Sequence, residues 1–288
     1  MKRNTVVTIG RQKSEGSKIA MLTAYDFSTA KLMDEAGVEI LLVGDSLGNT
    51  MLGFSDTLPV TMEDMIRASA AVSRGADNAF VVADMPFMSY QTSVYDAVVN
   101  AGRLVKEGGA EAVKLEGGVN FAKHIRAITE ASIPVMAHIG LTPQSVNAFG
   151  GFVVQGKDEE TGRRIIDDAL AVEEAGAFAV VLECVPSVLA TLVTEMLSIP
   201  TIGIGAGPGT DGQVLVYHDM LGLYGRKSPK FSRCFADVGA LMKRGVFDYI
   251  AATKTGSFPA KDHEFIINDD LMEKLKRYAE PKTEPADE

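Results

Sequence analysis

The chain has 288 residues, of which 46% are hydrophobic, and its formal net charge is −10 at pH 7. An acidic chain is a poor general nucleic-acid binder, because such surfaces need clustered lysine and arginine. The two cysteines, Cys184 and Cys234, lack the paired spacing of zinc sites and disulfide scaffolds, which indicates a reducing compartment. We expect a cytoplasmic protein without a membrane partner, since MKRNTVVTIGRQKSEG at the N-terminus has no apolar signal core.

Eight short apolar runs recur along the chain and are expected to form strands. They are nearly continuous in apolar residues rather than alternating, as in strands that are covered on both faces. In chain order they are IAMLTAYD from Ile19, EILLVGD from Glu39, AFVVADMP from Ala79, EAVKLEGG from Glu111, IPVMAHIG from Ile133, AFAVVLECV from Ala177, IPTIGIGAG from Ile199 and QVLVYHDM from Gln213.

Segments between most of these runs have helical signals. One opens at Ser28, a capping residue, and ends at Gly37, where a C-terminal glycine belongs. The next begins with Thr61, and the acidic Glu63 and Asp64 favour the positive end of the helix dipole. Four further segments follow the same pattern: SVYDAVVNAGRLVKEGG, VNFAKHIRAITEA, GRRIIDDALAVEEAG and SVLATLVTEML.

Alternation of strand and helix about eight times in under 300 residues predicts an α/β fold, a (β/α)₈ TIM barrel. An open doubly wound sheet is the alternative, but no dinucleotide fingerprint follows the first strand. We expect one barrel domain over residues 1–278. The charged, proline-bearing segment at 279–288 is expected to be a disordered tail.

Charged side chains follow the apolar runs at the strand ends, where barrels place their active sites. Lys114 and Glu116 are two residues apart, so they share one face of their strand. A single acid in such a place more often caps a helix, but several acids together need a common compensation for burial. The strand-end residues are Asp45, Asp84, Lys114, Glu116, His138, Glu183 and Asp219.

Three of these carboxylates, Asp45, Asp84 and Glu116, form a donor set of the kind that Mg²⁺ prefers. A cation held there could chelate a substrate with adjacent oxygens, such as a 2-oxo acid, and stabilise its enolate. Glu183 is then the expected catalytic base, because its apolar flanks should raise its pKa. Lys114 fits either a structural ion pair or a substrate ligand, and His138 either a structural or a substrate-contacting role.

Two short motifs suggest other chemistry. The tetrapeptide GDSL, which contains Ser46, is also the signature of a serine esterase family. That interpretation needs a downstream Asp-x-x-His, whereas the chain offers KDH at 261–263, with the wrong spacing, and HD at 218–219, in the wrong order. The glycine-rich GIGAGPGTDG at 203–212 matches neither nucleotide fingerprint, so we interpret it as a sharp turn or a substrate-shaping loop.

Longer motifs carry a family resemblance over about residues 3–260. The segments MLTAYDFSTAKLMDEAGVEILLVGDSLGNTMLGFSDTLPVT, VVADMPF, VKLEGG, MAHIGLTPQS, GGFVVQG, LECVP, TIGIGAG and VYHDMLG resemble the ketopantoate hydroxymethyltransferase family. The resemblance implies a barrel of the phosphoenolpyruvate mutase/isocitrate lyase type. It also implies transfer of a hydroxymethyl group from 5,10-methylenetetrahydrofolate to 3-methyl-2-oxobutanoate, which gives 2-dehydropantoate on the route to pantothenate.

The resemblance also implies roles for the strand-end residues. It implies one Mg²⁺ per subunit, at Asp45, Asp84 and Glu116, with Glu183 as the proton acceptor. It further implies a cytoplasmic homo-oligomer, often a decamer, and assigns no folate-binding residue. We expect the 2-oxo acid to be held by Asp45, Ser46, Asp84, Lys114 and His138.

The sequence departs from the family pattern in one segment, and one alternative enzyme shares the metal and enolate chemistry. The segment FPAKDHEF at 258–265 departs from the Glu-His-Ser-Phe that the family usually has after its FP pair, which leaves the role of this loop open. A metal-dependent carbon–carbon lyase of the same superfamily is the alternative enzyme. Such lyases carry a loop of the Lys-Lys-Cys-Gly-His type, which the sequence does not contain.

Overall fold

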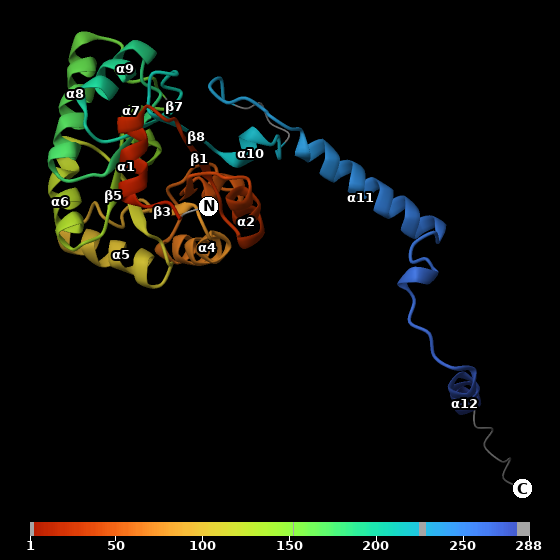
Figure 1. The fold of residues 1–288 in the computed structure, drawn as a ribbon. Coiled ribbons are helices and arrows are strands. Elements are labelled where there is room, and N and C mark those ends of the chain that lie inside the picture. The colour runs from red at the N-terminus through yellow and green to blue at the C-terminus, as the bar shows by residue number, and fades with distance from the viewer. Residues whose placement is uncertain (1–2, 152, 225–228, 281–288) are drawn as a thin grey trace, which may run out of the picture. The chain divides into compact units, whose positions relative to one another are not determined.

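The structure is a computed structural model that describes residues 3–151, 153–224 and 229–280. The chain divides into two compact units, Met1–Asp237 and Val238–Glu288. The first unit holds a closed barrel of eight parallel strands in the order β1 to β8 (Figure 1). The predicted barrel is confirmed, and an open sheet is excluded. The strands are β1 (Ile19–Thr23), β2 (Ile40–Val43), β3 (Phe80–Asp84), β4 (Ala112–Glu116), β5 (Val135–Gly140), β6 (Ala179–Glu183), β7 (Thr201–Ile204) and β8 (Gly212–Leu215).

Helices alternate with these strands and cover the outside of the barrel (Figure 1). The longer ones in the first unit are α1 (Val6–Glu15), α2 (Phe27–Glu35), α4 (Met62–Gly75), α5 (Val94–Lys106), α6 (Ala122–Glu130), α8 (Glu159–Glu174) and α9 (Ser187–Met196). Short turns of helix complete it: α3 (Leu47–Thr50), η1 (Val119–Phe121), η2 (Pro143–Ser145), α7 (Val146–Phe149) and α10 (Tyr217–Met220). The second unit contains α11 (Val238–Thr255), η3 (Lys261–His263) and α12 (Asp269–Ala279).

Helix starts follow the capping signals with one correction. Helix α4 begins at Thr61 as predicted, and the Thr61 hydroxyl accepts the backbone N–H of Asp64 in a capping box. Helix α2 does not begin at Ser28. Its N-cap is Asp26, which accepts both the backbone N–H of Thr29, at 3.0 Å, and the Thr29 hydroxyl, at 2.6 Å. A carboxylate that receives two donors is the stronger cap, so the helix starts earlier than predicted.

Alternate residues of each strand face opposite sides of the barrel wall. Leu42, Val82 and Val181 belong to a buried cluster inside the barrel. Their neighbours, such as Val81 and Leu182, belong to a second cluster between the strands and the helices. Both faces are therefore buried, which explains why the strands read as continuous apolar runs.

Helix α1 was not predicted, and it contributes to the interior of the barrel. Its Ile9 is fully buried in the same cluster as the inward-facing strand residues. Lys13 Nζ donates to Asp211 Oδ2 at 2.8 Å and to the Thr194 carbonyl at 2.9 Å, which ties the helix to the loop before β8. The carboxyl ends of the strands remain open for a site.

The expected domain limits stay a prediction. All eight strands lie in the first unit, whereas the single domain expected over 1–278 would include α11 and most of α12. Of the tail expected at 279–288, residues 281–288 lie outside the described part of the chain. Within the described ranges, every helix is too short or too polar to cross a membrane.

Asp34 on α2 gives a test of how the barrel wall is fixed. Its buried carboxylate accepts the backbone N–H groups of Asn78 and Ala79, at 2.8 and 2.6 Å, just before β3. We expect Asp34→Ala to lower the free energy of unfolding at pH 7 by about 1.5–3 kcal/mol, because these N–H groups lose a charged acceptor. Asp158→Ala, which removes an exposed N-cap from α8, should cost less, because water can replace the lost acceptor. Urea unfolding of both variants measures the difference, and equal losses would contradict this role.

The same variant has an expected pH dependence. Burial opposes ionisation of Asp34, but hydrogen bonds from Ala79 and Asn78 outweigh it and lower its pKa. A lowered folded-state pKa stabilises the protein above the unfolded value of about 3.9, and that contribution is lost as the pH falls through the folded-state pKa. The stability difference between wild type and Asp34→Ala should therefore hold at neutral pH and shrink below about pH 4.

Candidate active site

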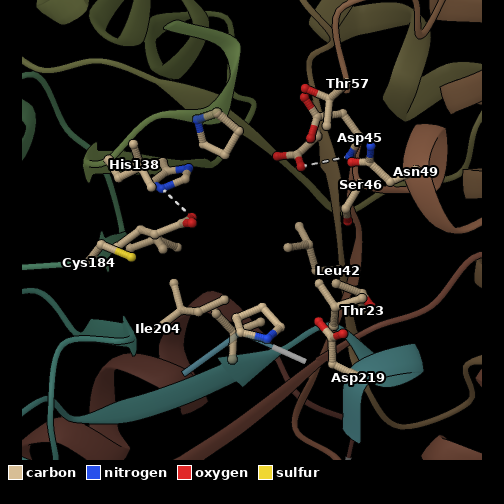
Figure 2. Close-up of a pocket in the computed structure, with 18 of the residues that line it drawn as sticks. Thr23, Leu42, Asp45, Ser46, Asn49, Thr57, His138, Cys184, Ile204 and Asp219 are labelled. Atoms are coloured by element: carbon tan, nitrogen blue, oxygen red, sulfur yellow. Dashed lines mark hydrogen bonds and ion pairs between the residues drawn. The ribbon is translucent and has the colours of Figure 1, made fainter. Parts of the chain in front are cut away.

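The inward-facing positions of four adjacent strands change from apolar to charged at their carboxyl ends. The inward series continues from Val82 to Asp84 on β3 and from Val181 to Glu183 on β6. On β4 and β5 it reaches Lys114, Glu116 and His138. The strand register sets Asp84 beside Lys114 and Glu116 beside His138. Side chains that are distant in sequence therefore meet in one cavity (Figure 2).

Lys114 and Asp84 form a buried ion pair. Lys114 Nζ lies 2.7 Å from Asp84 Oδ1, and each side chain is only 5% exposed. The other oxygen of the carboxylate, Oδ2, accepts the backbone N–H of Asp45 at 3.0 Å. Both oxygens of Asp84 are thus engaged by the protein, and Lys114 keeps a donor for another group.

His138 links three charged groups. Its Nδ1 lies 3.2 Å from Lys114 Nζ and 3.5 Å from Glu116 Oε1. Because Lys114 is the closer and can only donate, we assign the Nδ1 lone pair to Lys114 and the ring proton to Nε2. Nε2 lies 3.2 Å from Glu183 Oε2, within ion-pair distance but without the alignment of a hydrogen bond. This N–H is therefore buried and not fully satisfied.

Asp45 and Ser46 lie across the cavity from His138 and Cys184 (Figure 2). They follow β2 after Gly44, where an added Cβ would come 2.7 Å from Ser46 Oγ and would displace this hydroxyl. Ser46 Oγ shares a 2.8 Å hydrogen bond with the buried Tyr25 hydroxyl. The esterase interpretation would require a histidine beside Ser46, and His138 instead faces Lys114 and the carboxylates.

The cavity raises the pKa of its acids. Burial, with the negative charges of Asp84 and Glu116, raises the pKa of Asp45 to about 8. Burial also raises the pKa of Asp84, although the Lys114 ammonium opposes the shift. Burial opposes the charged form of Lys114 as well, but the surrounding carboxylates outweigh it, and its pKa lies above the ordinary value. The positive charge near these acids is therefore too small to compensate their ionised forms.

The pKa of His138 reflects the same excess of negative charge. Burial and the Lys114 ammonium oppose its protonation, but Glu116 and Glu183 outweigh them and raise its pKa to about 9. With Asp45, Asp84 and Glu116 ionised and the His138 ring neutral, the single ammonium of Lys114 leaves two negative charges in a buried cavity. Burying uncompensated charge is unfavourable, so this donor set is suited to a divalent cation.

A complete metal cage is not preformed. In residues 3–151, 153–224 and 229–280, no three or more His, Cys, Asp or Glu side chains are grouped to hold a metal ion. Direct ligation by all of Asp45, Asp84 and Glu116 thus stays a prediction. Hydrogen bonds within the described residues reach only one oxygen of Asp45, Oδ2, which leaves Oδ1 as the most available carboxylate ligand.

The cavity has a volume of about 630 Å³, which is in the range of cavities that bind small molecules. Beyond the charged cluster it is lined by a second set of polar and aromatic residues. These include Asn49, Asp56, Asp219, Tyr224, Lys230 and Phe231. Most of the predicted strand-end residues therefore occupy one part of a larger pocket, and Asp219 lies in its wall away from Asp45 and His138 (Figure 2).

Three residues of the site were missed from the sequence. Tyr25 follows β1 as the charged residues follow their strands, so its strand-end position was an available signal. Tyr90 and Gln144 lie in loops after β3 and β5, and no spacing rule connects them to the site. Both are buried and hydrogen-bonded to the charged cluster.

The fold defines a class, the closed (β/α)₈ barrels, and solved structures of similar fold include a member of the PEP mutase/isocitrate lyase superfamily. Among solved structures, phosphonopyruvate hydrolase matches with a TM-score of 0.59 at 14% identity over 96% of both chains. A second structure of that hydrolase is a complex with oxalate and Mg²⁺. 2,3-Dimethylmalate lyase, a member of the superfamily, matches with a TM-score of 0.56 at 18% identity, over 95% of this chain and 98% of its own. Likeness at these identities shows the fold.

The sequence comparisons are more specific. Residues 3–261 match the family model described as ketopantoate hydroxymethyltransferase, and the chain belongs to that family. It is 64% identical to the 3-methyl-2-oxobutanoate hydroxymethyltransferase of Clostridium novyi (strain NT), over 95% of this chain and 99% of that protein. It is 62% identical to the enzyme of the same name from Enterococcus faecalis, with the same coverage. The resemblance seen in the sequence is confirmed.

Gly140, at the end of β5, gives a test of how Glu183 is placed. Its φ is +93°, and an added Cβ would collide with the Glu183 carbonyl and lie 2.8 Å from Val185 Cγ2. Gly16 is a matched control, because its φ is +68° and an added Cβ would meet nothing within 4 Å. Both alanine variants should lose stability from backbone strain, and Gly140→Ala should lose about 1–3 kcal/mol more from the clash. Equal urea midpoints for the two variants would contradict this packing constraint.

Proposed function

We propose that the chain transfers a hydroxymethyl group from 5,10-methylenetetrahydrofolate to 3-methyl-2-oxobutanoate and forms 2-dehydropantoate. The observation that carries the proposal is the buried cluster of Lys114, Asp84, Asp45 and Glu116, with Glu183 beside it, in a member of this family. The substrate is a small 2-oxo acid whose two ends need a cationic and a basic environment. The cluster offers both in one cavity.

Mg²⁺, one per subunit, is the proposed cation. The two surplus negative charges and the carboxylate donors suit it, and Mg²⁺ commonly takes only one or two protein carboxylates directly and keeps several waters. Asp45 would bind it through its free oxygen, with Glu116 and Asp84 directly or through water. When bound, Mg²⁺ would supply the charge that stabilises a developing negative charge on the 2-oxo oxygen. A complex of phosphonopyruvate hydrolase holds oxalate, another small oxygen chelator, with Mg²⁺.

Lys114 and Ser46 are proposed to orient the 2-oxo acid. Lys114 donates to Asp84 and to Nδ1 of His138, so one of its three N–H groups remains for an anionic oxygen of the substrate. The Ser46 hydroxyl is fixed by Tyr25 and can accept from Tyr25 while it donates to the substrate. Two fixed donors restrict the substrate to few orientations, which is how an enzyme lowers the entropic part of the barrier.

Glu183 is the proposed base that removes the proton from C3 of the substrate. Its side chain is 14% exposed, more than the other carboxylates of the cluster, and it lines the cavity. The His138 N–H at Nε2 stabilises the ionised carboxylate and is free to strengthen its contact when substrate enters. This role requires a neutral His138 ring with its proton on Nε2. A bound cation would offset the negative charge of the cluster and so favour the neutral form of the ring.

The outer part of the cavity is proposed to receive the folate. A 2-oxo acid of this size occupies a small part of about 630 Å³, and the remainder lies over residues such as Asn49, Tyr224 and Phe231. Aromatic and polar side chains together suit a flat heterocycle with hydrogen-bonding edges. We also propose a cytoplasmic homo-oligomer, a homodecamer in the form that the family resemblance suggests. The lyase alternative has only the shared fold in its favour.

An assay of the full chain tests the proposed reaction. With 3-methyl-2-oxobutanoate, methylenetetrahydrofolate and Mg²⁺, we expect 2-dehydropantoate, measured by mass spectrometry. Removal of divalent ions with EDTA should reduce the rate to background, and added Mg²⁺ should restore it. Absence of product with every divalent ion tried would refute the function. Full activity after chelation would refute the metal role alone.

A substitution of the base tests the mechanism. Glu183→Gln keeps the shape of the side chain but removes its basicity, so exchange of the substrate C3 proton with D₂O should slow by about 10²–10⁴-fold. Binding of 3-methyl-2-oxobutanoate should change little. Glu174→Gln is the control, because Glu174 is an exposed helical glutamate with a 3.9 Å contact to Arg126. Proton exchange at the wild-type rate in Glu183→Gln, followed by NMR, would assign the base elsewhere.

A further inference from the structure

Gln144 is a buried residue to which neither the sequence nor the proposed mechanism assigns a role. It lies in the 3₁₀ turn η2 that follows β5, and only 6% of it is exposed. Glutamine is seldom this buried unless its amide is fully hydrogen-bonded. Its contacts therefore show what the protein uses it for.

The Gln144 side chain uses its whole hydrogen-bonding capacity. Its Nε2 donates to Asp45 Oδ2 at 3.0 Å and to the Met85 carbonyl at 2.9 Å. Its Oε1 accepts from the Tyr90 hydroxyl at 2.9 Å and from Gln91 Nε2 at 3.0 Å. The Met85 carbonyl can only accept, so the amide has one possible orientation and must present an N–H to Asp45.

The backbone of the same residue reaches a second carboxylate. The Gln144 N–H donates to Glu116 Oε2 at 2.9 Å. Tyr90, 1% exposed, supports both groups, because its hydroxyl accepts the Glu116 N–H at 3.1 Å and lies 2.9 Å from Gln144 Oε1. One residue thus contacts acids that come from the ends of two different strands, β2 and β4.

We propose that Gln144 is a positioning residue that sets the separation and orientation of Asp45 and Glu116 for a divalent cation. This inference rests on the proposed function of the site. By engaging Oδ2 of Asp45 and Oε2 of Glu116, Gln144 directs the remaining oxygens of the two acids away from η2. Its effect on the reaction passes through these acids, since Gln144 is not among the residues that line the cavity.

The chemistry of an amide suits this position. Two carboxylates that are buried near each other repel, so they need donors that hold them in place. A lysine or arginine would supply donors but would also cancel the negative charge that attracts the cation. A neutral amide fixes the carboxylates and leaves their charge available. Partners of this kind, one step removed from the metal, typically change metal affinity by about 10–100-fold.

Binding of Mn²⁺ to the purified full chain, followed by electron paramagnetic resonance, tests the proposal without substrate. Mn²⁺ shares the preference of Mg²⁺ for oxygen ligands and gives a direct signal. We expect Gln144→Met, which keeps the length of the side chain without its amide, to raise the Mn²⁺ dissociation constant by about 10–100-fold. Gln144→Asn has a shorter side chain whose amide cannot reach all of these partners, so it should also raise the Mn²⁺ dissociation constant. This variant tests the proposal if Gln144→Met does not fold.

Gln213→Met is the matched control. Gln213 also donates its amide to a backbone carbonyl, that of Gly207 at 2.9 Å, but its other contact is the Thr210 hydroxyl and not a carboxylate of the cluster. It should bind Mn²⁺ as wild type does. Folded Gln144 variants with lower melting temperatures and unchanged Mn²⁺ affinity would show that Gln144 serves only in packing, and would overturn the inference.

A further variant separates this inference from the proposed function. Wild type should bind one Mn²⁺ per subunit, and Asp45→Asn should lose it, if the cation site lies at Asp45. If wild type shows no such Mn²⁺, the cation role itself fails, and the inference fails with it. If wild type binds Mn²⁺ at Asp45 and the Gln144 variants bind equally well, only the positioning role is refuted.

Discussion

The buried ion pair between Lys114 and Asp84 is the interaction on which the carboxyl end of the barrel depends. Its 2.7 Å contact lies between two neighbouring strands, and each side chain is only 5% exposed. Truncating one partner would leave a charge buried without compensation, which typically costs about 3–5 kcal/mol. The pair allows charged residues to replace apolar ones at the inward positions of β3 and β4 without loss of the barrel.

Around this pair the site is organised by an excess of acid. With the His138 ring neutral, Asp45 and Glu116 add two negative charges that Lys114 does not balance, and burial together with the charges of Asp84 and Glu116 raises the pKa of Asp45. Gln144 and Tyr90 hold these acids with neutral groups, so the repulsion is kept and not removed. A site of this kind is less stable when empty than when it holds a cation, and this difference contributes to binding. Burial opposes protonation of His138, but Glu116 and Glu183 raise its pKa to about 9, and a bound cation would oppose this rise.

Much of the site followed from the rule that barrels place function at the carboxyl ends of strands. That rule found Asp84, Lys114, Glu116, His138 and Glu183, and the structure brings all five into one cavity. It could not find Gln144, which reaches Asp45 from a position 99 residues further along the chain. Helix α1 was also missed. Its buried Ile9 packs against strand residues from distant parts of the chain, and the sequence of the helix alone does not reveal those contacts. The predicted cap of α2 was wrong by two residues, since Asp26 and Ser28 are both capping residues and only the hydrogen bonds to Thr29 distinguish them.

The sequence by itself determined the eight strands, the closed alternation of strand and helix, and the family. These properties are local or repeat along the chain: apolar runs, capping residues, and charged residues at several strand ends. Tertiary structure alone decided which oxygen of each acid is engaged and which nitrogen of His138 faces Lys114. It also decided that a neutral amide, and not a second cation, holds Asp45 and Glu116. Such choices depend on distances of about 3 Å between strands and loops, which the register of the closed barrel fixes and no local pattern encodes.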